Sequence, residues 1–469
     1  MVFTTQVFLF YFLPLVLGVY YLLPRSSRNL FLALASYVFY GWWSPWFVSL
    51  MLVSTVLDWF CGLAVTAPGA SDRKRRAAVA VSVIGNLSLL GFFKYFMFAQ
   101  ENLNRLIEAF GGETTRMITV VLPIGISFYS FQSMSYSIDL YSGKAQRART
   151  FRDFMCYVSM FQQLVAGPIV RYREIAAQLG ERPQKGELFH LGALNFMIGF
   201  AKKVLLANTM GEIADLTFAA GSMPPHVAWV GVTAYAFQIY FDFSGYSDMA
   251  IGLGQMFGFS LPINFRSPYR SESITEFWRR WHISLSTFLR DYLYIPLGGN
   301  RGGVRRTYRN LAITMFLGGV WHGAQWTFIA WGVFHGVALS LERMAGKRAY
   351  WARLPRAVRV ALTFVLILFS WVLFRAEDMG AAGAYLGAMA GGVGDAAAGA
   401  VMAARVYQPF YVVALLLCGA IVWGGIETKD LADKASRSVP LALGTLGLFA
   451  LAVVAMMSQA ENPFLYFQF

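Results

Sequence analysis

Apolar runs of about 20 residues recur along almost the whole chain, and this pattern limits its fold more than any other feature. A helix of about 20 apolar residues is long enough to cross a hydrocarbon layer of roughly 30 Å. Of the 469 residues, 57% are hydrophobic and only 14% are charged, which does not describe a soluble surface. The sequence therefore predicts an all-α, polytopic membrane protein. It excludes a disordered chain, a collagen-like repeat, a disulfide scaffold and a soluble nucleotide-binding enzyme.

The chain is basic, with 39 Lys and Arg residues against 25 Asp and Glu residues. In membrane proteins such an excess collects in cytoplasmic loops that face anionic lipid, so we favour contact with membrane lipids and expect no nucleic acid as a partner. The three cysteines have no metal or disulfide spacing: Cys61, Cys156 and Cys418. No basic leader precedes the first apolar segment, 7–23, so we expect a retained span rather than a signal peptide.

Basic clusters between the first apolar segments predict the orientation of the chain. These segments are 7–23, 29–42, 46–65, 77–99 and 117–141. Basic residues follow the first segment at 25–28, the third at 73–76 and the fifth at 144–152, whereas acids and bases balance in the loop 101–116. The three clusters then face the cytoplasm, the loop faces outward, and the N-terminus is periplasmic.

The later part of the chain is less regular. Its apolar segments are 154–170, 191–208, 227–257, 310–341, 358–374, 406–423 and 440–457. Segment 154–170 has basic flanks and ends near Gly167 and Pro168, so we expect a re-entrant segment or a broken helix pair buried in protein. The Ala- and Gly-rich stretch 380–404 fits a low-complexity connector or a small-residue packing helix.

We expect about ten or eleven transmembrane or re-entrant helices, each near the length that a bilayer requires. They form one integral-membrane domain over residues 1–469, with a C-terminal group of spans at 358–469. The sequence shows no internal repeat that would divide the chain further.

The longest polar stretch, 264–310, carries nine arginines against three acidic residues. Ser273 and Glu276 have the spacing of a capping box, which predicts the start of a helix. Aromatic and leucine residues then recur at steps of three and four from Phe277 to Tyr292 and leave the arginines on another face. Such a helix usually lies in the membrane interface on the cytoplasmic side. Its arginines also fit a second role, at the entrance for an anionic cytoplasmic substrate.

The chain has five histidines, and their positions along the apolar segments differ. They are His190, His226, His282, His322 and His335. His322 lies 12 residues into the segment that starts near Asn310, which corresponds to about 18 Å of helix and to the middle of the bilayer. An ionisable side chain at that depth is costly and indicates a functional site. The alternative is a neutral histidine that bonds a carbonyl freed by the flanking glycines. His335 follows 13 residues later on another helical face, so we expect it outside the cavity of His322.

Polar residues also interrupt the apolar segment 227–257, at Asp242, Tyr246 and Asp248 among others. Two carboxylates and two phenols in one span must face protein or water rather than lipid. The two aspartates are six positions apart and on different helical faces, which argues against an acid/base pair. A structural network around Gly245 and a catalytic one both remain open.

Five motifs together resemble the membrane-bound O-acyltransferase (MBOAT) family, in its bacterial branch. They are QLVAGPIVRY at 163–172, DFSGYSD at 242–248, FWRRWHISLS at 277–286, RDYLYIPLGG at 290–299 and GVWHG at 319–323. Within that branch the chain is more similar to the alginate O-acetylation membrane subunit than to the teichoic-acid D-alanylation subunit. The reason is that it continues for more than a hundred residues past His322 and ends in PFLYFQF at 463–469.

The resemblance implies a core of helices with funnels from both faces of the membrane. It places an intramembrane histidine at His322 and a second polar position at His282, on the preceding cytoplasmic-side helix. His322 would take a proton from an attacking hydroxyl, and His282 would orient the acyl carbonyl or the donor. Further candidate substrate- or donor-binding residues are Gln163, Asp242, Tyr246, Arg279, Arg280, Trp281, Arg290 and Trp321. We expect no metal site and no bound cofactor.

The implied activity moves an acetyl group from a cytoplasmic donor, acetyl-CoA, across the bacterial inner membrane for O-acetylation of an exported polysaccharide such as alginate. A periplasmic polysaccharide O-acetyltransferase is the expected partner. One alternative is the transfer of D-alanyl or another acyl group to a cell-envelope polymer. A secondary transporter or lipid flippase would also have broken helices and intramembrane polar groups, although no repeat pairs occur here. A passive scaffold for polysaccharide export would have no need of His322.

The predicted orientation is testable by cysteine labelling in whole cells. Cysteines introduced at Ser71, Gly143 and Gly302 should react with an impermeant thiol reagent only after the cytoplasmic side is opened. A cysteine at Gly112 should react in intact cells, because the loop 101–116 is expected outside. Labelling of position 302 from outside would contradict the orientation.

Overall fold

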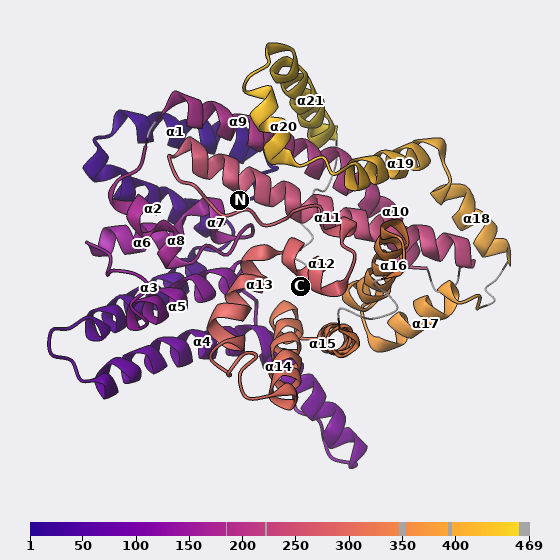
Figure 1. The fold of residues 1–469 in the computed structure, drawn as a ribbon, viewed down its shortest axis with the longest axis horizontal. Helices are drawn as coiled ribbons and strands as arrows, with labels where there is room; N and C mark the ends of the chain where they lie inside the picture. The colour runs from indigo at the N-terminus through magenta and orange to yellow at the C-terminus, as the bar shows by residue number, and fades with distance from the viewer. Residues whose placement is uncertain (184, 221–222, 347–352, 393–395, 459–469) are drawn as a thin grey trace. The chain divides into compact units, whose positions relative to one another are not determined.

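A computed structural model describes residues 1–183, 185–220, 223–346, 353–392 and 396–458. The described residues form helices, turns and irregular segments without any strand, as the apolar pattern predicts (Figure 1). They separate into two compact units, and each is described by itself. Unit 1 comprises Met1–Ala193 and Ala250–Pro262, and unit 2 comprises Leu194–Met249 and Ile263–Phe469. The single domain remains a prediction, and the ending at 463–469 lies outside the described residues.

Unit 1 is built from the first helices of the chain. They are η1 (Val7–Phe12), α1 (Leu13–Leu22), α2 (Arg25–Gly41), α3 (Pro45–Val65), α4 (Asp72–Ala109), α5 (Ile126–Tyr141), α6 (Phe151–Ser159), α7 (Phe161–Leu164) and α8 (Tyr172–Gly180). Residues of α9 (Gly186–Ala201) and α11 (Pro225–Met256) belong to both units. The expected turn between 29–42 and 46–65 is confirmed, because α2 ends at Gly41 and α3 begins at Pro45.

The remaining helices belong to unit 2. They are η2 (Lys202–Ala207), α10 (Asn208–Phe218), η3 (Pro268–Arg270), α12 (Ile274–Arg280), α13 (Ile283–Leu289), η4 (Arg290–Tyr294), α14 (Val304–His322), α15 (Trp326–Ala345), α16 (Arg356–Arg375), α17 (Met379–Met389), α18 (Ala396–Val406), α19 (Pro409–Gly424), α20 (Thr428–Ala435) and α21 (Val439–Ser458). The stretch 380–404 is therefore mostly helical where it is described. Tyr385 of α17 stacks on Phe218, with ring centroids 4.1 Å apart, so α17 is a packing helix.

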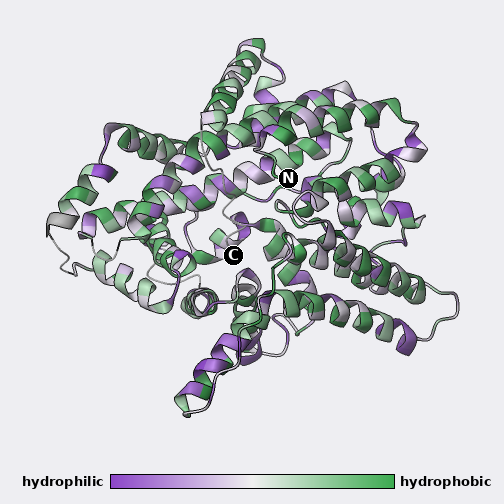
Figure 2. Ribbon diagram, turned by 180° about the vertical axis from the view of Figure 1, so that it is seen from behind, coloured by the Kyte–Doolittle hydropathy of each residue, from purple (hydrophilic) through white to green (hydrophobic). Residues whose placement is uncertain are grey.

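Five described helices are long and apolar enough to cross a membrane. They are Pro45–Val65, Asp72–Ala109, Gly186–Phe218, Arg356–Arg375 and Val439–Ser458. A sixth is added if Gly399–Val406 and Pro409–Gly424, which meet at a 62° bend, form one span. Figure 2 shows mostly hydrophobic residues along α21. The chain is thus a multi-pass membrane protein, and the count of ten or eleven helices stays a prediction.

Two boundaries in unit 1 differ from the sequence prediction. The helix expected over 77–99 continues through the predicted loop to Ala109, where Arg105 pairs with Glu101 one turn earlier at 2.7 Å. Such pairs stabilise helices, so the polar composition of this segment did not mark a loop. The segment expected over 117–141 becomes helical only at Ile126, after Gly125 in the left-handed region.

Helices α3, α4 and α5 lie side by side in unit 1 and bury one carboxylate among them (Figure 1). Asp58 of α3 is fully buried and accepts a hydrogen bond from Asn86 Nδ2 at 2.7 Å. The hydroxyls of Ser82 and Ser133 also donate to Asp58. Hydrogen bonds from three side chains compensate for the burial of the acid.

The broken helix predicted for 154–170 is confirmed. Helix α6 ends at Ser159, α7 covers only Phe161–Leu164, and the chain then runs irregularly through Gly167, whose φ is 108°. All residues from 154 to 170 are buried in the protein. Protein groups therefore replace the helical hydrogen bonds that the break removes; for example, Tyr157 Oη donates to the Val170 carbonyl at 2.9 Å.

The prediction of one span over 310–341 is wrong, because the chain reverses after His322. Helices α14 and α15 pack as an antiparallel hairpin joined by residues 323–325. They approach so closely that a Cβ on Gly332 would lie 2.6 Å from the Met315 carbonyl oxygen and 3.1 Å from Gly319 Cα. His322 is therefore the last residue of α14, at the turn, and its depth cannot be counted along a single helix.

Two buried ion pairs join η2 and α11 within unit 2. Lys203 Nζ lies 2.6 Å from Asp242 Oδ1, and the two side chains are 4% and 3% exposed. Lys202 pairs with Asp248 at 2.7 Å. The helices meet at Gly245, where a Cβ would lie 2.7 Å from the Gly199 carbonyl oxygen. The two aspartates of α11 thus form the ion pairs that the structural alternative predicts, and the catalytic alternative stays a prediction.

Removal of one member of the Lys203–Asp242 pair should destabilise the protein strongly. We expect Asp242→Asn to lower stability by about 3–5 kcal/mol, because a buried ammonium loses its counter-charge. The double variant Asp242→Leu with Lys203→Met should recover much of that loss, since no charge then remains buried. Thermal unfolding in detergent measures both. Equal destabilisation by the single and double variants would contradict this explanation.

Candidate active site

The site is built around a break in the polar stretch 264–310. We predicted a continuous amphipathic helix from Ser273 to Tyr292, but α12 ends at Arg280 and α13 begins only at Ile283. The predicted helix start is confirmed, since Ser273 Oγ accepts a hydrogen bond from the Glu276 amide at 3.1 Å. The break itself had no sequence signal, because helical periodicity continues through it.

His282 occupies the break in a left-handed conformation, with φ of 42° and ψ of 56°. This conformation is uncommon for a residue with a Cβ and requires support from its surroundings. The Ile283 amide donates to the Asn264 carbonyl at 2.9 Å, and the Arg266 amide donates to the Arg280 carbonyl at 3.0 Å. The irregular segment 264–266 therefore holds both sides of the bend.

The aromatic face of α12 packs against protein, whereas the position of this segment at the membrane interface stays a prediction. Phe277 is fully buried and Trp281 is 3% exposed. The Trp281 ring lies 5.0 Å from Phe265 and 4.9 Å from Trp371, centroid to centroid. Trp281, a candidate donor-binding residue, is thus a core residue that anchors the bend beside His282.

The structure brings the two candidate catalytic histidines to one tryptophan. The Trp321 ring centroid lies 6.2 Å from that of His282 and 5.0 Å from that of His322. His282 is fully buried, and His322 is 7% exposed. Burial lowers the pKa of His282 from 6.5 to about 3, because an imidazolium loses its hydration there. His282 is therefore neutral at physiological pH.

His335 joins the same aromatic cluster, contrary to our expectation for a residue on another face of one helix. Trp331 lies between the two histidines, 5.0 Å from His322 and 4.8 Å from His335 by ring centroid. Trp278 Nε1 donates a hydrogen bond to His335 Nδ1 at 3.2 Å. The hairpin reversal brings His335 into this cluster, which a count along one helix did not reveal.

A cavity of about 700 Å³ in unit 2 collects arginines from the polar stretch. Its lining residues are Arg266, Glu272, Ser273, Thr275, Glu276, Arg279, Arg280 and Arg359. Two of these arginines are neutralised, since Arg280 pairs with Glu276 and Arg359 pairs with Glu272, each at 2.7 Å. Arg266 and Arg279 have no carboxylate partner within the described residues, so their charges are available to an anion.

The other candidate binding residues divide between the two units. Arg290 pairs with Asp291 at 2.7 Å, is more than half exposed, and is not among the residues that line this cavity. Tyr246 is buried in α11. Gln163 belongs to unit 1, where its Nε2 donates to the Tyr157 carbonyl at 2.7 Å.

Sequence reasoning missed several residues of these networks. Asn264 supports the bend at His282, and Lys202 and Lys203 neutralise the aspartates of α11. For the lysines a signal existed, because two consecutive cations inside the apolar segment 191–208 require two buried anions. For Asn264 no pattern was available, since its partners lie about 20 residues further along the chain.

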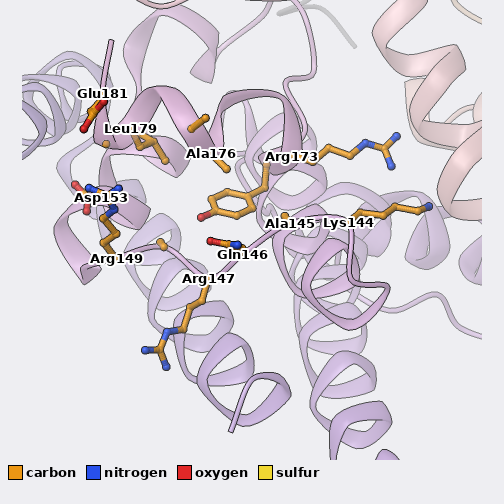
Figure 3. Close-up of a pocket in the computed structure, with 14 residues that line it drawn as sticks. Lys144, Ala145, Gln146, Arg147, Arg149, Asp153, Arg173, Ala176, Leu179 and Glu181 are labelled. Carbon is orange, nitrogen blue, oxygen red and sulfur yellow. The ribbon is translucent and has the colours of Figure 1, made fainter. Parts of the chain in front are cut away.

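A second basic cavity, of about 640 Å³, lies in unit 1 (Figure 3). Its cationic side chains extend from the loop between α5 and α6 and from α8; they are Lys144, Arg147, Arg149 and Arg173. Asp153 and Glu181 also line it. We had interpreted the cluster 144–152 only as a marker of the cytoplasmic side. Across the described residues, no group of three or more His, Cys, Asp or Glu side chains could hold a metal ion.

Comparison with known proteins identifies the family. The profile of the membrane-bound O-acyltransferase family matches residues 42–376. The chain is 44% identical to the probable alginate O-acetylase AlgI of Azotobacter vinelandii, with 100% of each chain covered. It is 49% identical to the protein of the same name from Pseudomonas syringae pv. tomato, over 83% of this chain and 75% of the relative. It is also 40% identical to the peptidoglycan O-acetyltransferase of Helicobacter pylori, over 83% of this chain and 80% of the relative. A family match over most of the chain, together with these relatives, shows that this protein belongs to the membrane-bound O-acyltransferase family and is an O-acyltransferase.

Proposed function

We propose that this O-acyltransferase transfers an acetyl group from cytoplasmic acetyl-CoA for O-acetylation of an exported polysaccharide such as alginate. The acetyl group crosses the bacterial inner membrane to a periplasmic O-acetyltransferase partner. The names of the relatives support acetyl transfer to envelope polysaccharides. The structural observation that carries the proposal is the meeting of two buried histidines at one tryptophan.

His322 is proposed as the base of the reaction. Its imidazole takes the proton of an attacking hydroxyl while the hydroxyl oxygen bonds to the thioester carbonyl carbon. The carbon–sulfur bond then breaks, and the proton passes from the imidazolium to the departing thiolate. The products are an O-acetyl ester and coenzyme A with a free thiol, so no oxidant or metal is consumed.

Purified protein and radiolabelled acetyl-CoA test the activity. Transfer of label to a hydroxyl acceptor with equimolar release of thiol supports acetyl transfer. A transporter or flippase would move its substrate without thiol release, and a scaffold would do neither. Replacement of alginate oligosaccharides by peptidoglycan fragments, each with the periplasmic partner added, identifies the polymer class.

Substitution of the three clustered histidines separates chemistry from packing. We expect His322→Gln to lower acetyl transfer by about 10² to 10⁴, because the amide cannot take the proton. His282→Gln should also be impaired, although it still folds. His335→Gln should stay within a few fold of wild type, because its side-chain oxygen can accept from Trp278 Nε1 as the imidazole does. Initial rates and thermal unfolding of the same preparations provide the comparison. Wild-type rates in a folded His322→Gln variant would remove His322 from the mechanism.

The arginine-lined cavity is proposed to bind the phosphates of the donor. Arg279→Gln should raise KM for acetyl-CoA about 10-fold or more, since a charge-assisted hydrogen bond contributes about 1.5–3 kcal/mol. The value of kcat should change little, because the phosphates are remote from the reacting carbonyl. Arg290→Gln is the matched control, since Arg290 lies outside this cavity lining and pairs with Asp291. An unchanged KM in Arg279→Gln would leave the cavity without a role in donor binding.

A further inference from the structure

We propose that Asn264 is a positioning residue that holds His282 in the tautomer protonated on Nδ1, so that Nε2 faces the substrate as a hydrogen-bond acceptor. The catalytic part of this inference rests on the proposed function, whereas the tautomer itself does not. Asn264 lies 18 residues before His282 in the chain, but its Oδ1 is only 3.2 Å from His282 Nδ1 in space. It is 1% exposed, and His282 is fully buried.

The orientation of the Asn264 amide follows from its neighbours. The Ser284 backbone amide lies 3.2 Å from Asn264 Oδ1, and a backbone N–H can only donate. The atom that faces it must therefore be the carbonyl oxygen and not the NH2 group. The Ser284 hydroxyl donates to the same oxygen at 2.9 Å. On the other side of the amide, Asn264 Nδ2 donates to Ser247 Oγ at 3.2 Å.

This orientation decides where the proton of His282 lies. Nδ1 of His282 is 3.2 Å from Asn264 Oδ1, which accepts hydrogen bonds and has no proton to donate. The Ser284 hydroxyl lies 3.5 Å from Nδ1 but donates to Asn264 Oδ1 at the shorter distance of 2.9 Å. An unprotonated Nδ1 would then face the lone pairs of Oδ1 without a donor, so Nδ1 carries the proton and donates it. In a neutral imidazole the second nitrogen then has a free lone pair. Nε2 of His282 is therefore an acceptor.

The surroundings of Nε2 indicate that its partner is a substrate. Nε2 is buried and forms no hydrogen bond with any described residue. Phe243 lies edge-on to the imidazole at 4.6 Å, and Trp321 lies at 6.2 Å, so the adjacent rings are uncharged. A buried acceptor without a partner is costly, and a hydroxyl or amide N–H of a bound substrate would satisfy it.

This tautomer changes the role that we first assigned to His282. A neutral imidazole with a bare Nε2 cannot donate a hydrogen bond to the acyl carbonyl. It accepts from an O–H or N–H group instead, either on the nucleophile or on the amide arm of the donor. His335 shows the opposite arrangement, because Trp278 Nε1 donates to its Nδ1 and leaves the proton on Nε2. The two buried histidines therefore have different tautomers within one cluster.

Nitrogen NMR of the full-length protein in lipid, labelled with 15N-histidine, tests the tautomer directly. The His282 signals are identified by their loss in His282→Gln. We expect the proton on Nδ1 of His282 and on Nε2 of His335 in the wild type. Asn264→Leu should shift His282 toward a mixture of tautomers and leave His335 unchanged. A wild-type His282 protonated on Nε2, or no change in Asn264→Leu, would overturn the assignment.

Kinetics with acetyl-CoA test whether this positioning serves the reaction. We expect Asn264→Leu to lower kcat by about 10² without raising KM for acetyl-CoA, because the acceptor is misoriented rather than the donor site lost. Asn264→Asp keeps the acceptor oxygen, so it should retain most of the activity. Its carboxylate also favours the imidazolium and raises the pKa of His282. Activity should therefore be lost at a higher pH than in the wild type as the solution is acidified.

The outcomes separate positioning from folding and from the proposed function. Ser286→Ala is the control for disturbance of the bend, since Ser286 Oγ contacts the Trp281 carbonyl rather than the imidazole. If Asn264→Asp and Asn264→Leu differ from wild type only in thermal stability, with an unchanged pH profile, the positioning role is rejected. Absence of acetyl transfer by the wild-type protein would reject the proposed function, while the NMR measurement still decides the tautomer.

Discussion

Polar groups in this protein must find partners inside the protein, because hydrocarbon offers none. Several buried charges of this structure meet the requirement through ion pairs and small hydrogen-bond networks. Asp242 is neutralised by Lys203, and Asp58 accepts hydrogen bonds from three side chains of neighbouring helices. The same constraint explains why the irregular segment 154–170 is buried in protein. Regular helices form the greater part of the described chain, and the buried departures at 154–170 and at His282 are supported by specific contacts.

Two such departures create the site. The left-handed conformation at His282 ends α12, and the turn after His322 ends α14. In a continuous helix the backbone groups bond to one another, and side chains project only outward from the helix axis. At a break, an imidazole can be held from several directions, as Asn264, Phe243 and Trp321 hold His282. Helix breaks therefore place the imidazoles of His282 and His322 beside one aromatic ring, that of Trp321.

The charged side chains of unit 2 differ in whether they have a partner of opposite charge. Arginines that pair with acids, such as Arg280 with Glu276, line the cavity of unit 2 together with Arg279. Aspartates of α11 look catalytic in the sequence because they interrupt an apolar segment. In the structure they are counter-ions of consecutive lysines. A buried charge thus indicates function only after its partners are known.

The sequence by itself determined the membrane class, the all-α fold, most helix positions and the family, because apolar period and motif spacing are local properties. The roles of His282 and His322 stay predictions. Only the tertiary structure decided that 310–341 is a hairpin and that the helix over 273–292 breaks at His282. Both depend on contacts between distant residues, such as Gly332 with Met315 and Asn264 with Ser284. Periodicity continues through both breaks, so no local pattern could reveal them. Neither could it reveal which nitrogen of His282 carries the proton, since that depends on the orientation of one buried amide.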